Sequence, residues 1–322
     1  MRGDVRLAVI SDLNSAYGST TYEPEVHKAI ELIPGWQPDI ILGGGDMVAG
    51  QSPSLGRSEI EAMWAGFERH VGGPIRKAGV PFGFTIGNHD ASAALSVGGN
   101  FLFRNDRELA SAYWNDPKHT PNLQFVDRAK FPFNYTFQHK DIFYLVWDAS
   151  TSRMPAEQIA WAEKALASST AQAAKMRIAI GHLPLYAVAV GRDDPGEVLA
   201  PAKQLADMLE RYRVRTYISG HHHAYYPAHH GKLELLHTSA LGSGSRPLLN
   251  SSLPPYKTLT IVDVDFGSES TVYTTYNMTT MQVVDHKTLP RLILGPTGRA
   301  LRLGVQESDL TAEERSLTYT PS

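Results

Sequence analysis

Five apolar segments of this sequence each run into a polar residue, and this repeated arrangement constrains the fold more than any other feature. The segments are predicted to be buried strands at residues 5–10, 39–42, 82–86, 176–180 and 215–219, and the side chains just beyond them are those of Asp12, Asp46, Asn88, His182 and His221. Glycine directly precedes the polar residue at four of these five junctions, which suits a sharp turn or a close backbone approach. Because ligands bind outside the carboxyl ends of strands in open α/β sheets, the five side chains are expected at one site.

The order of the remaining segments predicts an α/β fold. Helical patterns at residues 23–33, 58–70, 106–114, 155–168 and 201–211 alternate with strands, and Pro34-Gly35 is predicted to end the first of them. An aromatic hairpin is expected at 133–150. The strand-rich last third, to about residue 285, predicts a second sheet. The fold class is therefore expected to be a four-layer helix–sheet–sheet–helix sandwich of two mixed β-sheets.

Three consecutive histidines follow the last of the five strands, in the stretch GHHHAYY that begins at Gly220. In extended backbone, alternate side chains share a face, so His221 and His223 are predicted to point one way and His222 the other. Neutral imidazole is the commonest metal ligand, which favours a metal site here. The alternative for an isolated His-x-His is a polar loop without a ligand.

The composition excludes several classes of function. The chain has 322 residues, a net charge of −3 and no cysteine, so disulfides, thiolate zinc sites and cysteine nucleophiles are excluded. Without a basic stripe interleaved with aromatic residues, long nucleic acids are not expected as partners. No segment reaches the roughly 18 apolar residues of a membrane helix, and no signal peptide is visible. A soluble cytoplasmic protein is the default expectation, and a periplasmic or secreted one if the chain has been trimmed.

Taken together, the polar residues resemble the five signature blocks of calcineurin-like metallophosphoesterases, in order and in strand context. The resemblance covers residues 12–223, and its blocks are Asp12-x-Asn14, Gly45-Asp46, Gly87-Asn88-His89-Asp90, Gly181-His182 and Gly220-His221-His222-His223. It implies a phosphomonoesterase or phosphodiesterase that uses two divalent metal ions, with metal-bound hydroxide as the nucleophile and a small phosphate ester as substrate. By this resemblance His89 is the general acid, Asp46 bridges the metals, Asp12 and His223 hold the first metal, and Asn88, His182 and His221 hold the second.

The sequence departs from the family pattern at Asn14, where family members usually carry histidine. An amide oxygen is a weaker ligand than imidazole for zinc or iron but suits Mn²⁺, Mg²⁺ or Ca²⁺. Manganese is therefore expected first, with Fe, Zn, Mg or Ca as alternatives, and the first metal is expected to bind more weakly than the second. The alternative is that Asn14 does not bind metal and only hydrogen-bonds Asp12. Ala49 stands where the purple acid phosphatase branch has tyrosine, which argues against a tyrosinate–iron site.

Two further residues of the site have alternative roles. Asp90 either orients His89 or caps the following turn. Tyr17 either contacts the substrate, as Asn88 and His89 are expected to do, or packs against the protein.

Two rival functions are open. The first is a binding or scaffold protein on the same fold, with its metal centre weakened at Asn14; the retention of the acid His89 argues against it. The second is a Ser/His/Asp acyl hydrolase, for which no G-x-S-x-G elbow follows a strand.

Residues 286–322 lie outside the resemblance and are predicted to form an extension of a catalytic domain at 1–285. The segments RLILG and RALRLGV are expected to be edge strands, and Thr311 to Glu314 fits a capping box. The extension is expected to dock on the body or on a partner chain, in the latter case giving a homo-oligomer.

Overall fold

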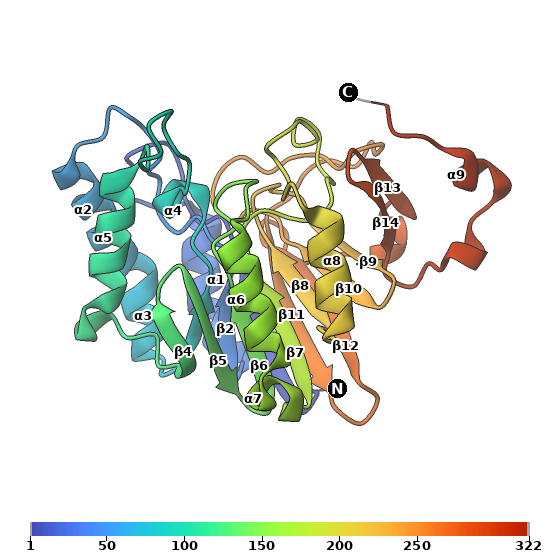
Figure 1. Ribbon diagram of the computed structural model, residues 1–322, viewed down its shortest axis with the longest axis horizontal. Helices are drawn as coiled ribbons and strands as arrows, with labels where there is room; N and C mark the ends of the chain where they lie inside the picture. Colours follow the sequence, from blue (N-terminus) through green and yellow to red (C-terminus); the bar gives the residue numbers. More distant parts are fainter. Residues whose placement is uncertain (1, 321–322) are drawn as a thin grey trace.

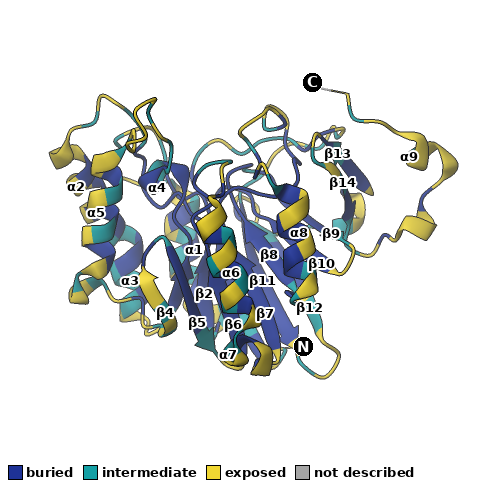
Figure 2. Cartoon of the chain, viewed as in Figure 1, coloured by how far each residue is buried: buried dark blue, intermediate teal, exposed yellow. Residues whose placement is uncertain are grey.

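The computed structural model describes residues 2–320 as a four-layer sandwich, in which two mixed β-sheets face each other and helices cover their outer faces (Figure 1). One hydrophobic core contains buried residues of both sheets. The strands of both sheets are largely buried, whereas the helices expose one side (Figure 2). The predicted fold class is confirmed.

The five-stranded sheet has the order β12-β11-β1-β2-β3. Its central strand β1 is an almost unbroken apolar run, as expected of a strand that is covered on both faces. β1 pairs in parallel with β2, with Leu7 opposite Ile40, and antiparallel with β11, with Ala8 opposite Ile261. The strands are β1 (Val5–Ile10), β2 (Ile40–Gly43), β3 (Phe82–Phe84), β11 (Thr258–Asp265) and β12 (Ser270–Asn277).

The nine-stranded sheet has the order β13-β14-β9-β10-β8-β7-β6-β5-β4. Its central strands β6, β7, β8 and β10 are mutually parallel, and the strands on either side are antiparallel. The strands are β4 (Gln124–Lys130), β5 (Asn134–His139), β6 (Ile142–Val146), β7 (Met176–Ile180), β8 (Thr216–Ser219), β9 (Tyr226–His230), β10 (Leu233–His237), β13 (Leu292–Gly295) and β14 (Gly298–Arg302).

The longer helices bury an apolar face. Val26, Ala29 and Ile33 form the buried side of α1, and α6 and α8 lie in front of the nine-stranded sheet in Figure 1. Within residues 2–320, no helix is both long and apolar enough to cross a membrane. The α-helices are α1 (Pro24–Trp36), α2 (Arg57–Phe67), α3 (Gly73–Lys77), α4 (Asn88–Ala91), α5 (Arg104–Asn115), α6 (Ala156–Ala167), α7 (Ser169–Ala173), α8 (Ala202–Arg211) and α9 (Ala312–Ser316), and a π-helical segment (Glu68–Gly72) joins α2 to α3.

Two expectations about these elements are wrong. The last third does not form a sheet of its own, because β11 and β12 complete the first sheet beside β1, while β9, β10, β13 and β14 extend the second. An apolar strand pattern does not specify its partner, and β11 pairs with the free edge of β1. Helix α1 also continues through Pro34 to Trp36. A proline in the last turn removes only one late hydrogen bond, and the helix ends where Gln37 adopts a left-handed conformation with φ of 52°.

The C-terminal segment extends the edge of the nine-stranded sheet. β13 is the outermost strand and the capping box at Thr311 is present, so these two predictions are confirmed, whereas β14 pairs with both β13 and β9 and is not the edge strand that was expected. Leu292, Leu301, Val305 and Leu310 form a small separate hydrophobic cluster, and the chain beyond β14 lies to the side of the body (Figure 1). The domain boundary at residue 285 stays a prediction, and residues 321 and 322 lie outside the described part.

Because Leu310 is only 2% exposed in this cluster, the substitution Leu310→Ala is expected to destabilise the C-terminal segment. The expected loss is about 2 kcal/mol, the lower end for truncating a buried leucine, since the cluster is small. Limited proteolysis and chemical denaturation measure the effect. Leu317 lies in the same segment and is 47% exposed, so Leu317→Ala is the matched control and should change little. Equal sensitivity of the two variants would contradict this packing.

Candidate metal centre

The carboxyl ends of five strands from the two sheets meet in one place. β1, β2 and β3 end on one side of the sandwich interface, and β7 and β8 end on the other. The backbone N–H of Asp12 donates to the carbonyl of Gly45 at 2.9 Å, and Gly220 donates to the carbonyl of His182 at 3.0 Å. His182 Nδ1 lies 2.8 Å from the carbonyl oxygen of Gly44, which joins the two sheets. The structure therefore brings the five strand ends together.

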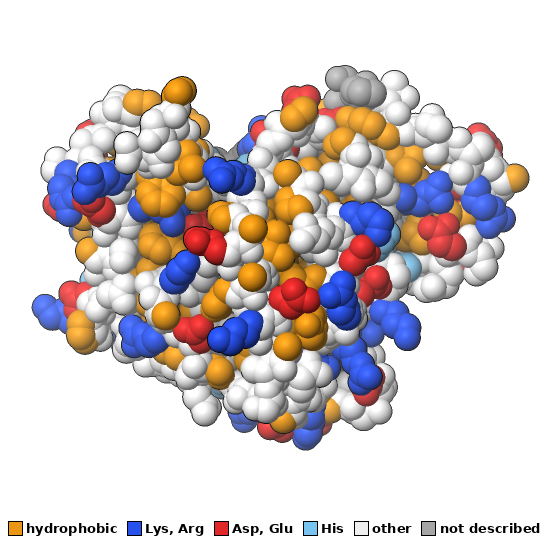
Figure 3. Space-filling model, viewed as in Figure 1, with side chains coloured by type: hydrophobic (Ala, Val, Ile, Leu, Met, Phe, Trp, Pro, Cys, Tyr) orange, Lys and Arg blue, Asp and Glu red, His pale blue; other side chains and the backbone are white. Residues whose placement is uncertain are grey.

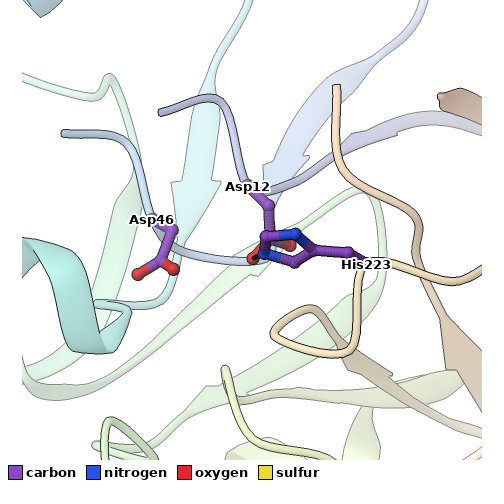
Figure 4. Close-up of side chains that lie close together, drawn as sticks. All are labelled: Asp12, Asp46 and His223. Carbon is purple, nitrogen blue, oxygen red and sulfur yellow. Dashed lines mark ion pairs between the residues drawn. The ribbon is translucent and has the colours of Figure 1, made fainter. Parts of the chain in front are cut away.

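The first group of side chains at this site is Asp12, Asp46 and His223 (Figure 4). One oxygen or nitrogen atom of each lies within 4.8 Å of those of the other two. His223 Nε2 is 3.1 Å from Asp12 Oδ1, and His223 Nδ1 hydrogen-bonds the carbonyl of Gly244 at 2.9 Å. The backbone carbonyl thus holds the ring with Nε2 directed at the carboxylates.

The second group lies on the other side of Asp46. Asn88 Oδ1 is 2.9 Å from His182 Nε2 and 3.0 Å from His221 Nδ1. Asp46 Oδ2 is 3.3 Å from the same His182 nitrogen. All four residues are buried. Asp46 is therefore the residue that the two groups share.

One buried carboxylate oxygen of the site, Asp46 Oδ2, lacks a hydrogen bond from the described residues. Asp46 Oδ2 is buried and accepts no hydrogen bond from residues 2–320, although it lies 3.3 Å from His182 Nε2. A buried carboxylate oxygen that accepts no hydrogen bond is costly, and a cation satisfies it. Carboxylate oxygens, an amide oxygen and imidazole nitrogens are also a donor set that holds divalent metals. The residues present therefore fit a divalent cation at Asp12, Asp46 and His223, with further donor atoms on the other side of Asp46.

The backbone at the site is strained at four of these residues. Asp12, Asp46, His221 and His223 have φ values of 50°, 54°, 66° and 53°, in the left-handed region that side chains other than glycine rarely adopt. Such residues cost about 1–3 kcal/mol each and cluster at functional sites. The expectation of extended backbone at His221 to His223 is therefore wrong.

The predicted directions of the three histidine side chains nevertheless agree with the structure. His221 and His223 face the site, whereas His222 is fully buried on the other side. The tight turn, rather than strand alternation, separates them.

Two junction glycines permit the close approach of the loops. A Cβ atom on Gly87 would lie 2.1 Å from Asp46 Oδ1, and one on Gly220 would lie 2.3 Å from Ser11 Oγ. Both distances are far inside van der Waals contact. Any side chain at these positions would push the carboxylates of Asp46 and Asp12 out of place.

The electrostatics of the site are dominated by the buried carboxylates and imidazoles. Burial raises the pKa of Asp46, but the charges and hydrogen bonds of His182 and His89 outweigh it and hold that pKa below its usual range. Burial lowers the pKa of His182, yet the carboxylates of Asp46 and Asp12 raise it to about 9. Metal binding at such a site releases protons, because the ligands must be deprotonated.

His89 lies at the edge of the site, and its ring is oriented by backbone. His89 Nδ1 is 3.0 Å from the carbonyl oxygen of Gly50, to which it donates, and Nε2 makes no hydrogen bond within residues 2–320. Tyr17 is 64% exposed, and its ring centroid lies 5.3 Å from that of His89. The exposed phenol therefore lies next to the ring of His89.

Asp90 is fully buried, and its carboxylate accepts hydrogen bonds from backbone N–H groups. Its Oδ1 accepts the N–H groups of Met47 at 2.7 Å and Val48 at 2.9 Å, and its Oδ2 accepts the N–H of Gly87 at 2.8 Å. No hydrogen bond joins Asp90 to the ring of His89. The idea that Asp90 orients His89 directly is corrected: its carboxylate caps the turn and anchors the loop after Asp46.

Asn14 lies beside the first group. Its backbone N–H donates to the carbonyl of Asp46 at 3.2 Å, and the residue is buried. Its side-chain amide makes no hydrogen bond to any residue in 2–320, so the hydrogen bond to Asp12 offered as an alternative is not observed.

Sequence reasoning missed two polar residues that contact proposed ligands. Asn88 Nδ2 donates to Gln51 Oε1 at 2.6 Å, which turns the amide oxygen of Asn88 toward His182 and His221. Glu197 Oε2 lies 2.8 Å from His221 Nε2. Both residues are on loops. In the sequence, a polar loop residue that contacts a site looks the same as one that is exposed to solvent.

The face of the molecule drawn in Figure 3 carries mixed charge. Lys and Arg side chains alternate with Asp and Glu over the face drawn in Figure 3, with no continuous basic stripe on it. A hollow of about 820 Å³ lies beyond α4, and Phe101, Arg107, Phe133 and Asp148 are among the residues that line it. It contains none of the proposed metal ligands.

Two solved structures share this fold. Purple acid phosphatase PPD1 from yellow lupin (Lupinus luteus) seeds has a similar fold, with a TM-score of 0.62 and 18% identity over 87% of this chain and 52% of that one. The chain thus spans about half the length of that protein. GAP50, the anchor in the inner membrane complex of Plasmodium, has a TM-score of 0.54 and 16% identity, covering 87% of each chain. No curated protein sequence matches the chain.

The family itself is identified from the sequence. A sequence model described as calcineurin-like phosphoesterase matches residues 5–225, which include all five strand ends. The family is metal-dependent, in agreement with the cluster of Asp12, Asp46 and His223. The chain therefore belongs to the calcineurin-like phosphoesterase family.

Proposed function

We propose that this protein hydrolyses small phosphate esters, monoesters or diesters, with the help of two divalent metal ions. The observation that carries the proposal is the position of Asp46 between two groups of donor atoms, with one carboxylate oxygen buried and without a hydrogen bond from the described residues. The family match supports a metal-dependent phosphoesterase in general terms. Separate cations on the two sides of one carboxylate suit an in-line displacement at phosphorus.

Each group of residues is proposed to hold one metal, with manganese as the first candidate. When bound, the metals would supply positive charge for the phosphoryl oxygens and lower the pKa of a water molecule. The first set is Asp12, Asn14, Asp46 and His223, and the second is Asp46, Asn88, His182 and His221.

Side chains of the protein are proposed to protonate and contact the leaving group. His89 donates Nδ1–H to the carbonyl of Gly50, so Nε2 is the nitrogen that can deliver a proton to the departing alkoxide. Asn88 is held by Gln51 with its amide oxygen at the second group, and it is also proposed to contact the substrate. The exposed ring of Tyr17, beside His89, is proposed to contact the leaving group.

A second candidate function is a binding protein on this scaffold. It is favoured by Asn14, which replaces the usual histidine ligand, and the fold is shared with GAP50, which is named as an anchor. At 16% identity that likeness concerns the fold alone. His89 and the complete second group favour the enzyme.

The test is hydrolysis of p-nitrophenyl phosphate and of bis-p-nitrophenyl phosphate, with each metal added singly to chelator-treated protein. Turnover of at least one ester with Mn²⁺ is expected, and the ratio of the two rates shows whether monoesters or diesters are preferred. No turnover of either ester with any metal would favour the binding protein.

The replacement Asn14→His is expected to tighten the first metal when zinc or iron is supplied, because imidazole binds these metals more strongly than an amide oxygen does. Elemental analysis after dialysis should find less than two metals per chain in the unmodified protein and a higher content in the variant. Two tightly held metals in both proteins would contradict the proposal that the first metal is bound weakly.

A further inference from the structure

A carboxylate outside every sequence block contacts one of the proposed ligands. Glu197 lies in the loop between β7 and α8, and its Oε2 is 2.8 Å from His221 Nε2. The other nitrogen of the same ring, Nδ1, is 3.0 Å from Asn88 Oδ1. The imidazole of His221 therefore stands between Glu197 and the second group of donor atoms.

This arrangement determines which ring nitrogen is free to bind a metal. A neutral imidazole carries one proton and one lone pair. A carboxylate at Nε2 retains the proton there, which leaves the lone pair of Nδ1 on the side of Asn88 Oδ1, 3.0 Å away. Carboxylate partners of ligating histidines fix the tautomer, orient the ring and raise its basicity.

The loop that carries Glu197 is held from several directions. Arg192 Nη1 donates to Glu197 Oε2 at 2.6 Å. The buried His222 donates Nε2–H to the backbone carbonyl of Glu197 at 2.9 Å and accepts the N–H of Val188 at Nδ1 at 3.3 Å. Because a site is only as well oriented as its supporting residues, these contacts make Glu197 a rigid support rather than a mobile surface side chain. They also give His222 a structural role.

The histidines of the two groups differ in what holds their rings. His223 of the first group relies on a backbone carbonyl, that of Gly244, which no substitution removes. Among the described residues, His221 is the proposed histidine ligand whose ring also contacts a carboxylate outside the two groups, that of Glu197. Building on the proposed function, we propose that Glu197 is a positioning residue that sets the affinity of the second metal by fixing the tautomer and orientation of His221.

The test is Mn²⁺ binding by chelator-stripped full-length protein, measured by calorimetry and by electron paramagnetic resonance of the bound ion. Glu197→Ala is expected to weaken one of two binding events by about 10–100-fold, with the other unchanged. Glu197→Gln retains the size and a neutral acceptor, so a smaller loss is expected. His223→Ala, which removes a proposed ligand of the first group, should weaken the other event and thereby assign the two.

The matched control is Arg192→Gln, which removes the ion pair to Glu197 but leaves the contact of Glu197 with His221. It is expected to lose much less affinity at the second site than Glu197→Ala, because His222 still holds the backbone carbonyl of Glu197. Unchanged binding in Glu197→Ala, or an equal loss in Arg192→Gln, would overturn the proposal. An unmodified protein that binds no Mn²⁺ would instead contradict the proposed function itself, so the two failures are distinguishable.

Discussion

Asp46→Asn is expected to lower kcat/KM for phosphate esters by about 100-fold or more. Asp46 is the one residue shared by the two groups of donor atoms, so the variant weakens both proposed metal sites at once. Even the partners of metal ligands cost about 10–100-fold when they are removed, and the shared ligand itself should cost at least as much. Steady-state hydrolysis and metal content, measured on the same preparation, check the result.

The backbone around Asp46 should survive this change, because asparagine has the same shape and also tolerates left-handed backbone. Circular dichroism should therefore be unchanged. Asp207 on α8 is a partly exposed aspartate paired with Lys203, and Asp207→Asn is the matched control with normal activity. An Asp46→Asn protein that keeps normal turnover and two metals would refute the bridging role.

His89→Gln is expected to slow hydrolysis in a manner that depends on the leaving group. Loss of a general acid costs about 10²–10⁴-fold when the departing alkoxide needs a proton. An alkyl phosphate should therefore lose most of its rate, whereas p-nitrophenyl phosphate, whose leaving group is already stable as an anion, should lose far less. Rates for a series of esters with rising leaving-group pKa measure the difference as a steeper slope in the variant.

A measurement of Mn²⁺ binding by the variant distinguishes a general-acid role of His89 from a structural one. His89 contacts Asp46 only through its backbone N–H, at 2.9 Å, and that contact does not need the ring. The variant should thus bind Mn²⁺ as the unmodified protein does. A uniform loss over all esters together with lost metal would contradict the assignment of His89 as the acid.

The strand ends could be predicted from sequence because each repeats one local pattern. The pattern is an apolar run, a turn and then a carboxylate, amide or imidazole side chain, and it recurs at Asp12, Asp46, Asn88, His182 and His221. Parallel strands bring such ends to one edge of the sheet. The pairing of β11 with β1 was not predictable in the same way. Both are apolar runs, and the choice between two sheets depends on contacts between segments more than 200 residues apart, such as Ala8 opposite Ile261.

The supporting residues of the site could not be predicted either. Glu197 and Gln51 lie on loops whose course is set by tertiary contacts, such as the hydrogen bond of His222 to the Glu197 carbonyl. The turn at His221 to His223 was missed for a related reason. Left-handed backbone at two histidines has an intrinsic cost, and it is adopted only because Asp12, Gly244 and neighbouring loops hold it in place.

The most direct measurement of the central claim is a titration of chelator-stripped protein with Mn²⁺, in which turnover of a phosphate ester is followed against equivalents of metal added. The account predicts negligible turnover without metal and an increase that reaches its plateau only when both sites are filled, beyond the first equivalent. Turnover that is independent of metal, or no turnover at any Mn²⁺ concentration, would contradict it.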